Sequence, residues 1–420
     1  MREMKESGVQ WIGKIPEHWE TIALQRVVSL INEKSMKQGI PYIGLENIES
    51  YTGKLLSLGG TEPEGICNQF KKEDVLFSKL RPYLTKCVSP SFDGKCTSEL
   101  LVLRNFKGIV DYLKYVLLSP KLIMEINSST YGTKMPRASW NYIKQCSIPL
   151  PPLPEQQRIA TFLDQKCKEI DDLIALQVEM ITELQAYKQS VISETVTKGL
   201  NPKVELKDSG VQWIGKIPEH WEVCRLKNYF KIGSGTTPQS DNPLYWGTEY
   251  NWITPADFKT EDIYIEYGKR SLSELGYKSF NLTLYPAQSI IFSKRAPIGQ
   301  VVINNQDVCI NQGCFGCIPS HKACTKFFYF LLSIYKEQFE LLGSGTTFKE
   351  ISAISFKNFK IACPKTITEQ QAIADYLDTQ CSRMDQLIRI KQSKIDTLQK
   401  YKKSIIYEYV TGKKEVPATV

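Results

Sequence analysis

The chain contains a tandem duplication, and this feature limits its possible folds more than any other. Residues 5–20 read KESGVQWIGKIPEHWE and residues 207–222 read KDSGVQWIGKIPEHWE, so the two segments differ at one position. We call them the entry segments. A second pair follows, because EQQRIATFLD at residues 155–164 matches EQQAIADYLD at residues 369–378. The chain is therefore two copies of one plan: an entry segment, a long block and a repeated frame segment.

The two long blocks, residues 21–150 and 223–363, do not resemble each other closely. Similar frames around different blocks indicate that the frames share a structural role, while the blocks carry something that differs between the halves. We expect an α+β protein in which two α/β domains are joined by two long helices that pair as a coiled coil. The expected boundaries are 1–150 for the first domain, 151–202 for the central helix, 203–363 for the second domain and 364–420 for the distal helix.

The frame segments, residues 155–197 and 369–410, carry a heptad pattern of apolar residues that is typical of paired helices. Eight residues are expected to pair the helices: Leu163, Ile170, Leu184 and Val191 in the first, and Leu377, Met384, Leu398 and Ile405 in the second. Gln177 and Lys391 occupy equivalent polar positions of this seam. They either fix the register of the helices or mark a place where the seam opens to solvent or to a partner, and the sequence leaves both open.

The entry segments combine tryptophan, isoleucine, proline and glycine, as in Trp11, Ile15, Pro16 and Trp19. Proline and glycine disfavour a regular helix. We therefore expect extended segments that pack on the domains or on the helix ends. His18 and His220 are interpreted as packing or capping residues rather than as ligands.

Both blocks alternate strand-like runs with turns, and both then show a helical run (112–126 and 325–341) followed by a loop rich in Gly, Thr and Lys. In such loops glycine allows close approach of the backbone, threonine binds phosphate, and lysine or arginine supplies charge and reads guanine. Ordinary solvated turns are the alternative, but recurrence in two diverged blocks favours nucleic acid. The candidate DNA-binding residues are Lys79, Arg81, Tyr83, Lys134 and Arg137 in the first block, and Lys294, Arg295, Thr346, Thr347 and Lys349 in the second.

Composition adds weaker constraints. The formal net charge of +8, from 53 basic and 45 acidic residues, is compatible with a polyanionic partner without requiring one. The charged N-terminus is no secretory signal and no apolar run is long enough to span a membrane, so we expect a cytoplasmic protein whose 12 cysteines are reduced.

No motif predicts a catalytic centre. A Walker lysine motif and a complete glycine-rich dinucleotide motif are both missing from the sequence, and the three histidines do not suit a catalytic triad. Cys314 and Cys317, with His321 and Cys324 nearby, have the spacing of a zinc site. Because Cys309 and Cys317 lie in strand-like runs, we favour buried thiols and expect no metal.

The chain resembles, over nearly its whole length, the specificity (S) subunits of type I restriction-modification systems. The resemblance rests on several motifs taken together. They are the entry segments, PPLPEQQ at 151–157, KLRPYL at 79–84, SGTTP at 234–238, WITPAD at 252–257, RAPIG at 295–299 and NQG at 311–313. Two departures are the single proline in residues 364–368 and Cys314, where the family usually has an apolar or aromatic residue.

The resemblance implies that each block is a target recognition domain that reads one half of a split, asymmetric sequence in double-stranded DNA. The two helices would pair as an antiparallel coiled coil with pseudo-twofold symmetry and would set the length of the unread spacer. Two modification subunits would bind the frame and methylate adenine at N6 with their own S-adenosylmethionine. Restriction subunits with ATP and Mg²⁺ join some complexes of the family. The chain itself would bind no cofactor, catalyse no reaction and contact no membrane.

A scaffold that binds protein partners through its coiled coil is the alternative from another class. Steep loss of DNA binding with rising salt would favour the specificity subunit, whereas absence of DNA binding at low salt would favour the scaffold. A stand-alone methyltransferase fits poorly, because the sequence has no cofactor-binding signature.

Overall fold

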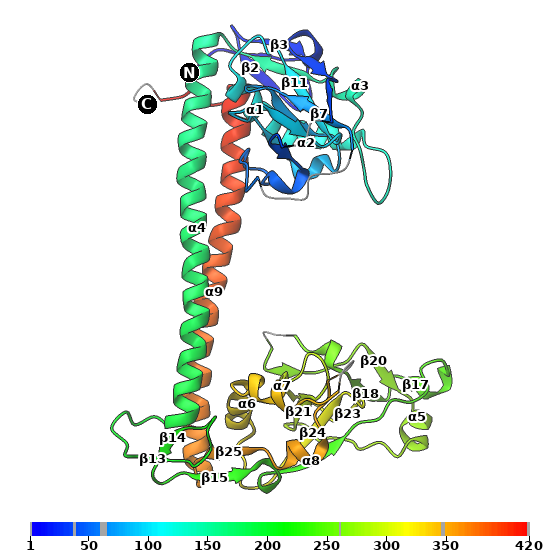
Figure 1. Ribbon diagram of the computed structural model, residues 1–420, viewed down its shortest axis with the longest axis vertical. Helices are drawn as coiled ribbons and strands as arrows, with labels where there is room; N and C mark the ends of the chain where they lie inside the picture. The colour runs from blue at the N-terminus through cyan, green and yellow to red at the C-terminus, as the bar shows by residue number, and fades with distance from the viewer. Residues whose placement is uncertain (1, 37–38, 59–64, 260–261, 346–348, 418–420) are drawn as a thin grey trace. The chain divides into compact units, whose positions relative to one another are not determined.

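The computed structural model describes residues 2–36, 39–58, 65–259, 262–345 and 349–417. The chain divides into two compact units. Unit 1 contains Met1–Glu179 and Lys391–Val420, and unit 2 contains Met180–Ile390. Each unit therefore holds one domain together with part of each of two long helices (Figure 1).

The domain of unit 1 is built on two four-stranded sheets, in the orders β5-β7-β10-β6 and β4-β11-β8-β9. Their strands are β4 (Ser29–Ile31), β5 (Lys34–Ser35), β6 (Tyr42–Ile43), β7 (Cys67–Phe70), β8 (Val75–Ser78), β9 (Cys87–Val88), β10 (Gly94–Cys96) and β11 (Leu100–Arg104). All four residues of β8 are buried. Alternate residues serve two cores, since Val75 and Phe77 join the larger cluster and Leu76 joins a smaller one.

Helices cover one face of this domain. They are α1 (Val110–Leu118), α2 (Pro120–Ser128) and the short α3 (Trp140–Ile143), and β12 (Ser147–Leu150) then pairs with β3 (Glu20–Ala23). The single helical run expected over 112–126 is thus two helices. The break falls at Ser119, which is extended (φ −63°, ψ 124°), because Pro120 disfavours a helical residue before it.

The domain of unit 2 has a five-stranded sheet, β16-β24-β21-β22-β19, and a four-stranded sheet, β17-β20-β18-β23. The strands are β16 (Phe230–Ser234), β17 (Trp246–Gly247), β18 (Tyr250–Ile253), β19 (Tyr264–Ile265), β20 (Arg270–Leu272), β21 (Ile290–Ser293), β22 (Val301–Asn304), β23 (Val308–Ile310) and β24 (Cys314–Pro319). The strand-like runs noted in both blocks are confirmed as β8, β11, β18, β21 and β22.

Four short helices complete this domain: α5 (Glu274–Ser279), α6 (Thr325–Ser333), α7 (Lys336–Leu342) and α8 (Ala353–Lys357). The run expected over 325–341 is again two helices, α6 and α7. β15 (Glu222–Arg225) pairs with β25 (Lys360–Cys363), as β3 pairs with β12 in unit 1. Buried phenylalanines fill the core, with Phe292, Phe339 and Phe356 in mutual ring contact.

The two long helices are α4 (Leu153–Lys198) and α9 (Ile367–Val410). In unit 1 the first part of α4 packs on the last part of α9, where Lys402 Nζ lies 2.6 Å from Asp171 Oδ1. In unit 2 the last part of α4 packs on the first part of α9, where Lys188 Nζ lies 2.6 Å from Asp385 Oδ1. The expected pair of long helices is confirmed, and their direction is antiparallel (Figure 1).

Each entry segment forms a two-stranded hairpin. β1 (Met4–Glu6) pairs with β2 (Lys14–Pro16), and β13 (Leu206–Asp208) pairs with β14 (Lys216–Pro218). In each unit the second tryptophan donates its indole N–H at 2.9 Å to a glutamate in the first turn of a long helix, Trp19 to Glu155 and Trp221 to Glu369. The structure therefore confirms that the entry segments are extended and pack on the ends of the long helices.

Candidate nucleic-acid interface

In unit 1 the two basic loops predicted from sequence lie against each other. Residues 79–84 follow β8, and residues 131–137 follow α2. Leu80 and Arg137 form an antiparallel bridge, and Ala138 N donates to Lys79 O at 2.9 Å. A second bridge joins Tyr131 to Arg137 and closes the second loop. Two segments that are far apart in the sequence thus form one surface.

Several side chains on this surface are exposed. Tyr83 is 42% exposed, and Lys134 is exposed between Tyr131 and Met135, which are also exposed. Lys79 is half-buried. Arg81 is held in the left-handed backbone region (φ 47°) while its N–H donates to Pro136 O at 2.7 Å. Such strain in a residue other than glycine is often found at functional sites.

Arg137 is not a free cation. Its Nε lies 3.1 Å from Oε2 of Glu99 and its Nη2 lies 2.9 Å from Oε1. The two side chains retain 34% and 22% exposure. The hydrogen bonds that Arg137 donates to Glu99 raise the pKa of Arg137, so the guanidinium stays charged.

Unit 2 repeats the arrangement after β21. Arg295 and Glu350 form an antiparallel bridge, and Ile351 N donates to Lys294 O at 3.1 Å. Ser344 and Glu350 form the bridge that closes the second loop. Lys349 is exposed, whereas the candidates Thr346 and Thr347 lie outside the described residues.

Lys294 and Arg295 share one carboxylate. Lys294 Nζ lies 2.8 Å from Oε1 of Glu350, and Arg295 Nε lies 2.8 Å from Oε2. Lys294 is 9% exposed and its ammonium lies 4.9 Å from the centre of the Phe315 ring. Burial opposes ionisation of Glu350, but hydrogen bonds from both cations outweigh it and lower its pKa. Lys294 is therefore a fixed internal charge, while Arg295, with a side chain 44% exposed, faces solvent.

The structure also places the eight residues expected to pair the helices. Leu163, Ile170, Leu377, Met384 and Ile405 are buried, and Leu184, Val191 and Leu398 are partly buried. Of the two polar seam residues, Gln177 is 5% exposed and Lys391 is partly buried.

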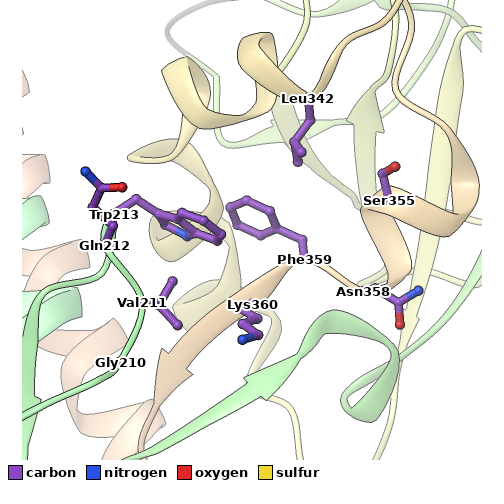
Figure 2. Close-up of a pocket in the computed structure, with 9 residues that line it drawn as sticks. All are labelled: Gly210, Val211, Gln212, Trp213, Leu342, Ser355, Asn358, Phe359 and Lys360. Carbon is purple, nitrogen blue, oxygen red and sulfur yellow. The ribbon is translucent and has the colours of Figure 1, made fainter.

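A pocket of about 390 Å³ lies beside the second entry segment (Figure 2). Trp213 stacks on Phe359, with ring centres 5.9 Å apart and planes at 19°. Trp213 is 45% exposed, whereas its duplicate Trp11 is buried and donates its indole N–H to Ser147 O at 3.0 Å. Among the nine residues that line the pocket, Lys360 is the one ionisable side chain, so the pocket has no pair of groups for acid–base chemistry.

Three of the four cysteines considered for zinc belong to the sheets, and the fourth, Cys324, directly precedes α6. Cys309 lies in β23, and Cys314 and Cys317 lie three apart on β24, so their side chains project from opposite faces. They accordingly join different clusters, Cys314 one and Cys317 another. Burial raises the pKa of Cys309 to about 12. Within the part of the chain that the structure describes, no group of three or more His, Cys, Asp or Glu could hold a metal.

Sequence reasoning missed Glu99 and Glu350, the acidic partners of the basic loops. One signal could have found their surroundings, because VLFSKLRP at residues 75–82 matches IIFSKRAP at residues 290–297. That match shows that β8 and the residues after it correspond to β21 and the residues after it. It therefore also relates the two loops that pair with these segments. Among the described residues, no helix has the length and apolar character that crossing a membrane requires.

A duplicated helical frame that carries two different domains, each with a paired basic loop, is the architecture of a DNA-recognition protein. The model of the type I restriction modification DNA specificity domain matches residues 16–180 and again 218–400. The chain belongs to this family, whose members are specificity subunits and not catalytic ones.

Relatives match along the whole length. The putative type I restriction enzyme MjaX specificity subunit of Methanocaldococcus jannaschii is 31% identical over 426 residues, covering 96% of this chain and 95% of the relative. The MjaVIII specificity subunit of the same organism is 28% identical, covering 95% and 94%.

Two solved structures share the fold. A structure described as the basis of complex assembly and conformational transition of the type I R-M system has a TM-score of 0.76 at 20% identity, covering 94% of this chain and 98% of its own. The HsdS subunit from Thermoanaerobacter tengcongensis has a TM-score of 0.56 at 21% identity, covering 95% and 98%.

Proposed function

We propose that this chain selects the DNA sequence on which a type I restriction-modification complex acts, and that each domain reads one half of a bipartite, asymmetric target. The observation that carries the proposal is the pair of basic loop surfaces, one in each unit, built on the same backbone hydrogen bonds by different side chains. The same scaffold with different side chains suits two readers of different sequences.

The residues of these surfaces divide by role. Exposed Lys134 and Lys349 suit phosphates, which set affinity and not sequence. Arg81, Tyr83, Arg137 and Arg295 are the proposed contacts to base edges or sugars, and Lys79 and Lys294 support them from below. The proposed domain limits remain 1–150 and 203–363, with helical segments at 151–202 and 364–420 between and after them.

We further propose that the frame binds two modification subunits in equivalent ways. Each unit exposes three large apolar side chains at equivalent positions of its helices: Leu173, Leu176 and Tyr401 in unit 1, and Leu387, Ile390 and Tyr187 in unit 2. Each member of one trio is the duplicate of a member of the other, 214 positions away. Exposed apolar groups at repeated positions favour docking of two copies of one partner.

The proposed division of labour leaves the chemistry to the partners. The modification subunits would bind S-adenosylmethionine and methylate adenine at N6, and restriction subunits, where present, would bind ATP and Mg²⁺. What the chain contributes is binding and orientation of DNA.

The proposal is tested by exchanging residues 223–363 for the corresponding block of a relative with a different target. Methylome sequencing of a host that expresses the chimaera with its modification subunits should show one half of the methylated motif replaced and the other retained. An unchanged motif would refute the proposal. Exchange of residues 21–150 is the matched control, because it should alter the other half.

A further inference from the structure

The loop surfaces of the two units share a backbone scaffold but differ in which segment carries which charge. By their bridges, Arg295 stands where unit 1 has Leu80, and Glu350 stands where unit 1 has Arg137. In unit 2 the arginine therefore comes from the segment after β21, whereas in unit 1 it comes from the loop after α2.

Both units nevertheless hold one arginine against one glutamate at this place. In unit 1 the glutamate is Glu99, just before β11, and in unit 2 it is Glu350 itself. Different residues from different segments give the same result, a guanidinium fixed by a carboxylate beside the exposed loops. Because both units form this arginine–glutamate pair although its residues come from different segments, the pair itself is expected to have a function.

The fixed arginines have a common geometry. In each pair the glutamate takes the Nε side of the guanidinium. The opposite edge, formed by Nη1 and the outer N–H of Nη2, points away from that carboxylate. Among the described residues no partner is recorded for Nη1 of Arg137 or of Arg295. Side-chain exposures of 34% and 44% show that both arginines reach solvent.

An open, held guanidinium edge suits one ligand in a DNA groove. Guanine presents O6 and N7 side by side in the major groove, and the two parallel N–H groups of an arginine match them. A phosphate can be bound by a lysine ammonium as a point charge, so a phosphate contact does not require a guanidinium fork held in one direction. Holding the fork by a second residue is useful where direction matters, as in reading a base.

Charge balance in unit 2 supports the same role. A bare carboxylate beside DNA would repel phosphates, but Glu350 is bound by both Lys294 and Arg295. Because Lys294 is buried at 9% exposure, it stays with Glu350 when Arg295 binds a base. The glutamate can therefore aim the arginine without leaving an unbalanced negative charge at the interface.

We propose that Arg137 and Arg295 each read one guanine, the first in one half of the target and the second in the other, and that Glu99 and Glu350 are their positioning residues. This rests on the proposed function, and it adds the identity of one base in each half and the residue that selects it.

The test uses the full chain assembled with its own modification subunits, on duplexes carrying the methylated motif. The wild-type complex should prefer guanine at one position in each half by roughly 5- to 150-fold. Arg295→Gln should abolish the preference at that position in the second half alone, and Arg137→Gln should do so in the first half alone. Arg26→Gln and Arg225→Gln, exposed arginines away from the loops, should change neither half.

A base analogue separates reading from support. Replacing the selected guanine by 7-deazaguanine removes N7, so it should weaken wild-type binding but not binding by the glutamine variant. Arg295→Lys should keep the salt dependence of binding and lose the guanine preference, because it keeps the charge without the fork. Glu99→Gln should lower the preference in the first half by a smaller factor, with the melting temperature of the complex unchanged. Glu350→Gln should lower the preference in the second half and also lower the melting temperature, because it leaves the buried Lys294 ammonium without its carboxylate.

The outcomes are distinguishable. Arginine variants that retain the full guanine preference in both halves, or an unaltered response to 7-deazaguanine, would overturn the inference while the proposed function stands. A wild-type complex that methylates no defined motif would instead remove the proposed function on which the inference rests.

Discussion

At the residue scale, the first turn of each long helix contains a glutamate that fixes an entry segment. Glu155 accepts a hydrogen bond from the Trp19 indole and contacts His18 and Arg2. Burial by itself would raise the pKa of Glu155, but these hydrogen bonds stabilise the carboxylate more strongly, so the pKa is lowered. Glu155→Gln should destabilise unit 1 by about 1–2 kcal/mol near pH 7. Urea unfolding followed by tryptophan fluorescence measures the loss.

The pH dependence gives this prediction its sign. Since the pKa of Glu155 is lower in the folded than in the unfolded chain, its contribution is present above the ordinary value of about 4.3 and is lost as the pH falls through the folded value. The difference between wild type and Glu155→Gln should therefore shrink below about pH 4. Glu17→Gln, at an exposed position of the same segment, should leave stability unchanged, and a gap that persisted at low pH would contradict the mechanism.

The same scale shows where sequence reasoning reached and where it stopped. Basic residues next to glycine and aromatic residues could be selected from the sequence, because composition and local spacing describe a loop well. Their partners could not, since Glu99 is 38 positions from Arg137 and Glu350 is 55 from Arg295. Only the pairing of strands brings them together, and one sequence does not state which loops pair.

At the element scale, the helices carry two duplicate ion pairs that differ in burial. Lys402 and Asp171 retain 7% and 17% exposure, whereas Lys188 and Asp385 retain 23% and 38%. Asp171→Asn should lower stability by about 3–5 kcal/mol, because it leaves the buried Lys402 ammonium without its carboxylate. It also removes the ion pair with the more exposed Lys54, whose Nζ lies 2.7 Å from Asp171 Oδ2. The matched Asp385→Asn should cost less than about 1 kcal/mol, as exposed pairs do.

Thermal unfolding of the two variants measures the contrast, with Asp172→Asn at a neighbouring exposed position as control. Equal losses from Asp171→Asn and Asp385→Asn would show that the duplicate pairs contribute alike and that burial does not decide. The comparison is internal to one chain, so differences in expression or refolding between proteins do not enter it.

The elements themselves were predictable to the degree that their pattern is local. A heptad repeat over some forty residues defines a helix and its buried face, and α4 and α9 start two residues before the expected positions. Each of the two helical runs expected in the domains is interrupted and forms two helices, and in unit 1 the interruption lies just before Pro120. Sheet order could not be read, because neighbours such as β8 and β11 or β21 and β24 depend on contacts that no local pattern encodes.

At the scale of the whole molecule, the proposal that the helices set the spacer makes a metric prediction. Removing one heptad from each helix, residues 177–183 and 391–397, keeps the seam nearly in phase because seven residues are close to two turns. The ion pairs of Asp171 and Asp385 lie outside both deletions. Each helix shortens by about 10 Å, which corresponds to about 3 base pairs at 3.4 Å each.

Methylome sequencing should then show both half-targets unchanged and the spacer shorter by about 3 base pairs. A five-residue deletion from each helix, 177–181 and 391–395, is the control, since it turns the following apolar residues by about 140° and should abolish modification through loss of packing. A heptad variant that methylates the original motif with its original spacer would show that something other than helix length sets the distance between the half-targets. A variant with a shorter spacer and altered half-targets would mean that the domains depend on the deleted residues for reading as well as for spacing.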